Sequence, residues 1–335
     1  MTRSVVRFVI WSLVTVFRLL HVPSEVSAAL SDDSLHSVTT RRNFVYSYFY
    51  EPPQHGQPMI IFLHGFPSTH RDWAAQISGT SAPEDVGSYR ILDIAGNIID
   101  ILDHEKVDKV IAVGHDWGAV PLARILNTHV DRVLGAAFLS VGYLPPRPDF
   151  NFDAYIAQLH QTVGYDVFGH MKFFAEDDAA TILSDHLDSF YSLFFPSDPF
   201  VWRTDLAPLG KAKEWIERNR MLPRPRYWTT EQEREHQKRL LKKGLQAPLL
   251  WHRGWVNGIN NADDATIPLS AYNISIPVFF GLTLQDYIDI PSLTLPPMLE
   301  TCSKLTVHNF TTSHWVMQEA PDELNEQLNR FFETL

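Results

Sequence analysis

Hydrophobic and polar residues follow two different periods in the first part of the chain. Runs of β-branched, aliphatic and aromatic residues at 44–50, 59–65 and 107–116 predict strands, and the third run is apolar enough to be buried on both faces. Residues 89–105 and 118–133 instead carry apolar side chains at helical spacing. This alternation of strands and helices predicts a mostly parallel sheet with flanking helices, which is the α/β fold class.

The pattern changes at 143–150, a proline-rich segment with the sequence YLPPRPDF. The residues that follow are helical in pattern and rich in aromatic and charged side chains, until strand signals return at 274–284 and 305–310. A helix at 322–335 ends the sequence. The predicted organisation is an α/β core at residues 31–142 and 266–335, interrupted by a helical cap at 143–265.

The N-terminal residues 1–30 have the layout of a signal peptide, with basic residues before the apolar stretch FVIWSLVTVF and small residues around Ala28. The stretch is shorter than a typical membrane span. We expect a leader here and passage through the secretory pathway. The alternatives are a membrane-associated protein held by this segment and a cytoplasmic protein with an untargeted leader. Export would expose the sequons at Asn273 and Asn309 to glycosylation.

Composition and charge narrow the function classes. The chain has 335 residues, a formal net charge of −11 and a pI of about 5.7, which disfavours nucleic acid as a partner. Cys302 is the only cysteine, so one chain can form neither a disulfide nor a cysteine-based metal site. We predict no metal and no cofactor.

The clearest chemical signal is GHDWG at 114–118, of the form glycine-x-nucleophile-x-glycine. Such a sequence between a buried strand and a helix predicts a strained turn that presents its central side chain, here Asp116, at the carboxyl edge of the sheet. The next helix offers its N-terminal N–H groups to negative charge. A carboxylate is a poor nucleophile for esters but a good one for a saturated carbon that carries a leaving group. The product is an ester at Asp116, which water must then hydrolyse.

Hydrolysis of that ester needs a base and an oxyanion hole, and the sequence offers both. His314 follows the last strand signal as the candidate base, and Asp286 follows an earlier strand, where it could orient the imidazole. The backbone N–H groups of Phe66 and Trp117 are candidates for the oxyanion hole. The chain order of nucleophile, acid and histidine is that of α/β-hydrolases.

Each element also has a purely structural interpretation. The glycine-flanked aspartate could be an ordinary turn, His314 a buried structural histidine, and Asp286 a helix cap. Asp289 competes with Asp286 for the orienting role. Four elements in the right order, each at a predicted strand end, favour the catalytic interpretation.

The sequence at this point resembles a known family. The segments FLHGFPSTHRDW, VIAVGHDWGA, VFFGLTLQDYI and SHWVMQEAPDELN are similar to those of epoxide hydrolases with the α/β-hydrolase fold, closest to a fungal branch, over roughly Leu35 to Leu335. The resemblance implies Asp116 as nucleophile, Asp286 and His314 as the charge-relay pair, and a helical cap over the site. It implies a small apolar epoxide and water as reactants, with a polyketide epoxide of fungal secondary metabolism as one substrate suggested by the family.

Two further interpretations share the aspartate nucleophile. A haloalkane-type dehalogenase would use His170, His252 or Trp251 to bind the halide. Fluoroacetate dehalogenases place arginines just after the nucleophile, whereas this chain has none before Arg124. A third interpretation is a hydrolase-like chain with impaired catalysis.

The chain departs from the family pattern at the two cap tyrosines that activate the epoxide. In the corresponding contexts, VFGHMKFF and APLLWHRGW, it has His170 and His252. An imidazolium is a stronger acid than a phenol, and a neutral imidazole can still donate one hydrogen bond. We therefore predict that both histidines activate the substrate, with Tyr155 and Tyr165 as the alternatives.

A second departure concerns the sheet. After HRDWAAQI the family pattern has a buried strand, but here SGTSAPEDVGSYR follows directly, and about twenty residues are missing by ordinary strand and connection lengths. The sequence thus predicts the deletion of a central strand near residues 76–79. Its loss would leave neighbouring strands with unpaired backbone groups.

Overall fold

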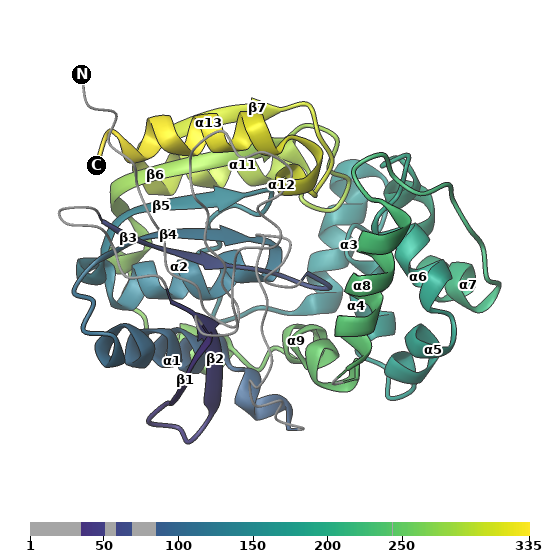
Figure 1. The fold of residues 1–335 in the computed structure, drawn as a ribbon, viewed down its shortest axis with the longest axis horizontal. Coiled ribbons are helices and arrows are strands. Elements are labelled where there is room, and N and C mark those ends of the chain that lie inside the picture. Colours follow the sequence, from purple (N-terminus) through teal and green to yellow (C-terminus); the bar gives the residue numbers. More distant parts are fainter. Residues whose placement is uncertain (1–34, 51–57, 69–84, 243) are drawn as a thin grey trace.

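The computed structural model describes residues 35–50, 58–68, 85–242 and 244–335 (Figure 1). Its main sheet is parallel, with the strand order β3-β4-β5-β6-β7. The strands are β3 (Met59–Leu63), β4 (Val110–His115), β5 (Val133–Leu139), β6 (Ile274–Thr283) and β7 (Cys302–Phe310). All residues of β3 and β4 are buried, as their apolar sequences predict.

A short antiparallel hairpin, β1 (Leu35–Thr39) and β2 (Val45–Phe49), forms a separate sheet. The apolar run at 44–50 predicted β2, but no apolar pattern predicted β1. Within the described residues, β3 pairs only with β4, and the hairpin does not pair with the main sheet. The proposed deletion lies in 69–84, outside the described residues, so it stays a prediction.

The first core helix buries one regular apolar face. In α1 (Ile91–His104), Ile94, Ile98 and Leu102 recur at intervals of four residues and are all buried. The other core helices are α2 (Ala119–Thr128), α11 (Pro291–Thr301), α12 (Val316–Glu319) and α13 (Pro321–Phe332), with short 3₁₀ turns η4 (Val86–Tyr89), η5 (Asp116–Gly118), η6 (Val130–Arg132) and η8 (Leu269–Tyr272). The sequence did not predict α11, because prolines at two interior positions argue against a helix.

Between β5 and β6 the chain forms the helices of the stretch predicted as a cap. They are α3 (Phe152–Val163), α4 (Gly169–Phe174), α5 (Ala179–Asp185), α6 (Leu187–Phe194), the π-helix η7 (Trp202–Leu206), α7 (Lys211–Glu217), α8 (Thr230–Leu241), α9 (Gln246–Val256) and α10 (Asn261–Asp264). Figure 1 shows these helices beyond one end of the sheet. Local signals start some of them: the Asn151 side chain caps α3, and Thr229 with Gln232 forms a capping box on α8.

Two apolar clusters hold the molecule together. One lies on both faces of the sheet, and the other consists of cap residues packed against core residues such as Phe66, Trp117 and Trp315. The second cluster is strongly aromatic and joins the cap to the carboxyl ends of the strands. A site at those strand ends is therefore enclosed between core and cap.

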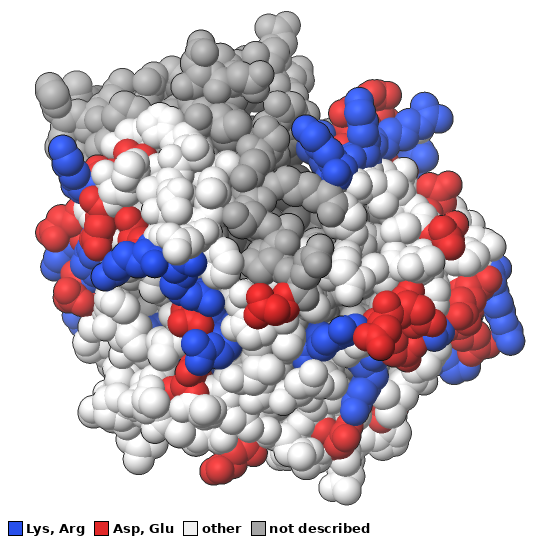
Figure 2. Space-filling model, turned by 90° about the horizontal axis from the view of Figure 1, so that it is seen from below, with Lys and Arg blue, Asp and Glu red and all other residues white. Residues whose placement is uncertain are grey.

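The described surface is mixed in charge. On the face in Figure 2, acidic and basic side chains are interspersed over the described residues. Among the described residues, no helix has both the length and the apolarity needed to cross a bilayer. The sequon residues Asn273 and Asn309 are both exposed.

Candidate active site

Asp116 occupies a turn that its glycine neighbours make possible. The strand β4 ends at His115, and Asp116 has a φ of +53°, in the left-handed region that non-glycine residues rarely adopt. A Cβ atom on Gly118 would collide with the carbonyl group of Leu63, and one on Gly114 would lie 2.9 Å from the backbone of Ala119. This predicted strained turn presents the carboxylate at the end of the sheet.

Backbone donors hold the Asp116 carboxylate. The N–H group of Phe66 donates to Oδ1 of Asp116 over 2.7 Å, and the backbone N–H of Trp117 also hydrogen-bonds this carboxylate. A Cβ atom on Gly65 would overlap the same carboxylate, so a glycine is needed beside it. The two N–H groups predicted as an oxyanion hole therefore meet at the carboxyl group whose ester would be hydrolysed.

His314 connects the two predicted carboxylates. Its Nδ1–H donates to Oδ2 of Asp286 over 2.7 Å, and its Nε2 lies 3.5 Å from Oδ2 of Asp116. His314 and Asp286 are both buried. Three residues 28 to 198 positions apart in the sequence thus form one row, in the order that a nucleophile, base and orienting acid require.

Asp289 approaches the same imidazole but is farther away. Its Oδ2 lies 3.7 Å from Nδ1 of His314, beyond hydrogen-bonding distance. Asp286 also accepts hydrogen bonds from the backbone N–H groups of Ile288 and Asp289 over 2.9 and 3.0 Å. These donors fix the Asp286 carboxylate in place, so geometry favours Asp286 over Asp289 as the residue that orients His314.

The charges of this row stabilise one another. Burial raises the pKa of Asp116, but the hydrogen bond and positive charge of His314 outweigh burial, so the pKa lies below the usual value. The pKa of Asp286 is lowered too, because the charge and hydrogen bond of His314 again outweigh burial. Burial lowers the pKa of His314, but the charge of Asp286 and the contacts with Asp116 raise it well above the usual value. The resting site therefore holds an imidazolium between two carboxylates.

Two buried residues that the sequence did not single out position the backbone of His314. The Nε2–H group of His115 and the hydroxyl of Ser140 both donate to the carbonyl oxygen of His314, each over 2.8 Å. Burial lowers the pKa of His115 to about 4, so its ring is neutral near pH 7. His115 is the last residue of β4, and Ser140 directly follows β5. No sequence pattern marks either residue as a partner of His314.

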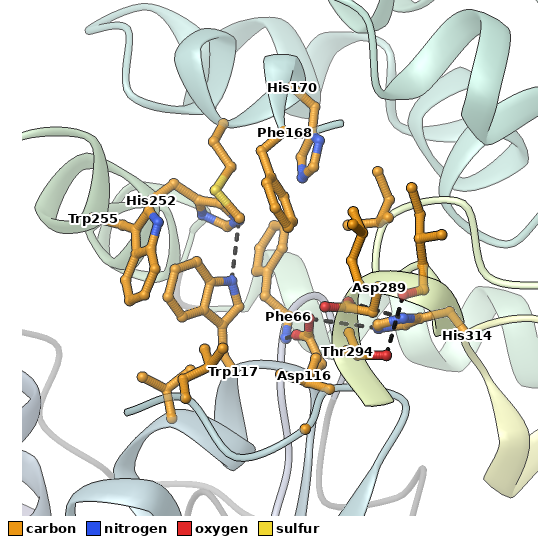
Figure 3. Close-up of a pocket in the computed structure, with 18 of the residues that line it drawn as sticks. Phe66, Asp116, Trp117, Phe168, His170, His252, Trp255, Asp289, Thr294 and His314 are labelled. Atoms are coloured by element: carbon orange, nitrogen blue, oxygen red, sulfur yellow. Dashed lines mark hydrogen bonds and ion pairs between the residues drawn. The ribbon is translucent and has the colours of Figure 1, made fainter. Parts of the chain in front are cut away.

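A cavity of about 210 Å³ opens above Asp116, between the core and the cap. Figure 3 shows its labelled residues: Asp116, Asp289 and His314 lie on the core side, and Phe168, His170, His252 and Trp255 reach it from the cap. Its wall is mostly apolar and aromatic, as in pockets for small apolar ligands.

His170 and His252, the predicted activating residues, both line this cavity and are buried. Burial lowers the pKa of each to about 3, which makes both rings neutral near pH 7. The imidazolium form considered from the sequence does not fit this environment, whereas the neutral hydrogen-bond donor does. The indole N–H of Trp117 donates to Nε2 of His252 over 3.2 Å, so the proton of this neutral ring is on Nδ1.

The two alternative tyrosines differ in position. Tyr155 lines the cavity, with the guanidinium of Arg147 4.4 Å from its ring centre. Tyr165 donates its hydroxyl proton to the carbonyl oxygen of Tyr287 over 2.7 Å and is not among the lining residues. Of the two, Tyr155 is the one that the cavity places near a substrate.

Comparisons with known proteins give a consistent result. No protein-family model matches the chain. The chain is 26% identical over 312 residues to epoxide hydrolase A of Mycobacterium tuberculosis, which covers 84% of this chain and 92% of that protein. It is 24% identical over 305 residues to an epoxide hydrolase of Caballeronia sordidicola, with coverages of 83% and 88%.

Solved structures agree. Epoxide hydrolase A from Mycobacterium thermoresistibile matches with a TM-score of 0.72 at 23% identity and covers 90% of this chain and 98% of its own. An epoxide hydrolase from Vigna radiata matches with a TM-score of 0.70 at 20% identity and coverages of 91% and 100%. The predicted α/β-hydrolase fold is thus confirmed. The predicted enzyme class, a hydrolase, is also confirmed, because the chain is similar to proteins named epoxide hydrolases.

Proposed function

We propose that this protein opens an epoxide by forming a covalent ester at Asp116 and then hydrolysing it to a diol. One observation supports this most: the carboxylate at the strained turn contacts both oxyanion-hole donors and His314 at once. The similarity to epoxide hydrolases supports the choice of an epoxide over other electrophiles.

In the first half of the reaction, the Asp116 carboxylate attacks a ring carbon and the carbon–oxygen bond of the epoxide breaks. The low pKa of Asp116 keeps the nucleophile ionised. His170 and His252 line the opposite side of the cavity, and we assign them the role of orienting the substrate. As a neutral imidazole, His170 stabilises developing negative charge on the oxygen through its Nε2–H, whereas His252, whose Nε2 accepts from Trp117 and whose Nδ1 is buried, shapes the cavity wall beside it.

Esterification of Asp116 also prepares the second half. The ester carries no charge, so His314 loses one of the two carboxylates that raise its pKa. His314 can then give up its Nε2 proton and act as a neutral base towards water. Water attacks the carboxyl carbon of Asp116, and the N–H groups of Phe66 and Trp117 bind the oxyanion.

The cavity wall supports an apolar substrate. Phe66, Trp117, Phe168, Phe194, Trp202 and Trp255 all contribute aromatic surface to it. By analogy with the fungal branch of the family, we propose a polyketide-type epoxide of secondary metabolism as the physiological substrate. Because the similar proteins are named epoxide hydrolases, we prefer epoxide opening to dehalogenation.

The decisive experiment is a single turnover in ¹⁸O-labelled water with excess enzyme and styrene oxide as the test substrate. The label should enter the Asp116 carboxylate first, because water attacks the ester there. Label found only in the diol after one turnover would contradict the ester mechanism, and halide release from a chlorinated analogue without diol formation would favour dehalogenation.

We also propose that the protein enters the secretory pathway and carries glycans on Asn273 and Asn309. Residues 1–30 lie outside the described residues, so the leader stays a prediction from sequence. N-terminal sequencing of the native protein should find a start near residue 29, and a glycosidase should reduce its mass. An intact Met1 on a soluble cytosolic protein would contradict the proposal.

A further inference from the structure

Three carboxyl groups surround the single imidazole of His314. Oδ2 of Asp286 lies 2.7 Å and Oδ2 of Asp289 3.7 Å from its Nδ1, while Oδ2 of Asp116 lies 3.5 Å from its Nε2. One imidazolium offsets only one negative charge. In so buried a site, three ionised carboxylates would leave two negative charges uncompensated, and a proton on one of them lowers this cost by leaving only one.

Hydrogen bonds decide which of the three carries a proton. Asp286 receives two backbone N–H groups and Nδ1–H of His314. Asp116 receives backbone N–H groups of Phe66 and Trp117. Among the described residues, no donor is within hydrogen-bonding distance of the Asp289 carboxyl group, which is 9% exposed. Asp289 is therefore the group for which ionisation is least favourable.

The electrostatic environment of Asp289 agrees with this assignment. Burial raises its pKa well above the usual value, and the negative charges of Asp286 and Asp116 raise it further, against the effect of His314. A neutral carboxyl group is a proton donor as well as a hydrogen-bond donor. Asp289 borders the cavity next to His314, on the same side as Asp116 (Figure 3).

The cavity offers few other groups that can release a proton. With pKa values of about 3, the rings of His170 and His252 are already neutral near pH 7, so they have no proton to release as imidazolium acids. Burial raises the pKa of Tyr155 above its usual value, which makes its phenol a weaker acid. Asp289 is the strongest neutral acid among the described residues that line the cavity.

We propose that Asp289 is the proton donor of the ring-opening step, a role that rests on the proposed epoxide chemistry. As the Asp116 oxygen forms its bond to the ring carbon, the carbon–oxygen bond of the epoxide breaks and its electron pair takes the proton of Asp289. This leaves a hydroxyl group on the ester and a carboxylate at Asp289.

The proton balance then closes around His314. The imidazolium, no longer opposite an ionised Asp116, returns a proton to the Asp289 carboxylate through the water that enters. Neutral His314 takes a proton from the attacking water and passes it to the departing alcohol oxygen. The Asp116 carboxyl group finally protonates His314, which restores the starting state and gives a net addition of water to the epoxide.

A test that needs no substrate measures the charge of Asp289. The infrared difference spectrum of the parent minus Asp289→Asn at pH 7 should contain the carbonyl band of a neutral carboxylic acid. The substitution should not lower the melting temperature, because it replaces one neutral group with another. A carboxylate band, or a large loss of stability from a broken ion pair with His314, would overturn the proposal.

The second test uses rapid-quench mass spectrometry of the Asp116 adduct formed from styrene oxide. Asp289→Asn should slow adduct formation by about 10²–10⁴-fold, the usual effect of losing a general acid. The parent rate should fall as pH rises through the raised pKa of Asp289, and the variant should lack this fall. The other ionisable groups facing Asp289 are Asp286, His314 and Asp116 from the core, and Tyr155 with Arg147, His170 and His252 around the cavity.

The outcomes separate this proposal from the proposed function. If the parent forms no adduct with epoxides, both are overturned. If the parent forms the adduct and Asp289→Asn does so at the parental rate, only the role of Asp289 is overturned. Slower ester hydrolysis with unchanged adduct formation would instead assign Asp289 to His314. Asp149→Asn, at an exposed position of the cap, is the matched control and should behave like the parent.

Discussion

The indole N–H of Trp117 donates a hydrogen bond to Nε2 of His252 over 3.2 Å. Trp117 directly follows Asp116, the proposed nucleophile, and His252 lies on the cap helix α9, so this bond joins the core and cap sides of the cavity. It also determines the protonation of His252, because a ring nitrogen that accepts a hydrogen bond carries no proton. The hydrogen bond between core and cap thus fixes the tautomer of His252.

Replacing both His170 and His252 with phenylalanine should slow formation of the Asp116 adduct. Both rings line the cavity, and loss of hydrogen bonds to a developing oxyanion typically costs about 10²–10³-fold in rate. Because burial keeps both rings neutral, the histidines themselves should add no pH dependence between pH 6 and 8. Rapid-quench rates across this range test both points. A double variant with the parental rate would leave Tyr155 as the next candidate.

Replacing His314 with glutamine should stop turnover after the first half of the reaction. The ester would form at Asp116, but no base would activate water, and loss of a general base typically costs about 10²–10⁴-fold in rate. Intact-protein mass spectrometry should show the adduct accumulating. Asp116→Ala gives the matched control, because it should form no adduct at all. Steady-state turnover of His314→Gln at the parental rate would exclude this role.

The ion pairs among Asp116, His314 and Asp286 should stabilise the folded protein within a defined pH range. The raised pKa of His314 stabilises the folded state below the ordinary value of 6.5, and this contribution is lost as pH rises through the folded-state pKa. The lowered pKa values of Asp116 and Asp286 act above 3.8 and are lost as pH falls through the folded-state values. All contributions coexist between 3.8 and 6.5.

Urea denaturation of the parent and of His314→Gln at a series of pH values measures the histidine part. The stability difference in favour of the parent should be constant between pH 3.8 and 6.5 and shrink at higher pH. A difference that does not depend on pH would mean that His314 has the same proton affinity in the folded and unfolded chains.

The buried guanidinium of Arg124, on helix α2, hydrogen-bonds to residues near both ends of the cap. Arg124 donates to Asp264, near the end of the cap, over 2.8 and 2.9 Å, and to the carbonyl oxygen of Leu144, at its beginning, over 2.8 Å. Asp264→Asn should cost about 3–5 kcal/mol in the free energy of unfolding, because Arg124 would keep an unpaired buried charge. Glu214→Gln, in a solvent-exposed pair with Lys211, should have a much smaller effect, because water screens that pair. Equal effects in urea denaturation would contradict this.

Features that are local in the chain could be predicted from the amino-acid sequence alone. Glycine spacing predicted the turn at Asp116, because only a residue without Cβ fits beside β3 and α2 there. Runs of apolar residues predicted the strands, and their order predicted that Asp286 and His314 follow strand ends. The carboxyl ends of parallel strands share one edge of a sheet, so the position of each proposed catalytic residue in its own segment was enough to predict that they lie close together.

Features that depend on contacts between distant segments became apparent only in the folded protein. The environment that keeps His170 and His252 neutral comes from packing against core and cap aromatics, and no sequence pattern states how deeply a side chain is buried. The sequence left Asp289 as an alternative to Asp286 for orienting His314. The distances and hydrogen-bond donors in the folded protein distinguished the two. Charge states follow from the solvent and donors that folding leaves around each group, and these exist only once the chain has folded.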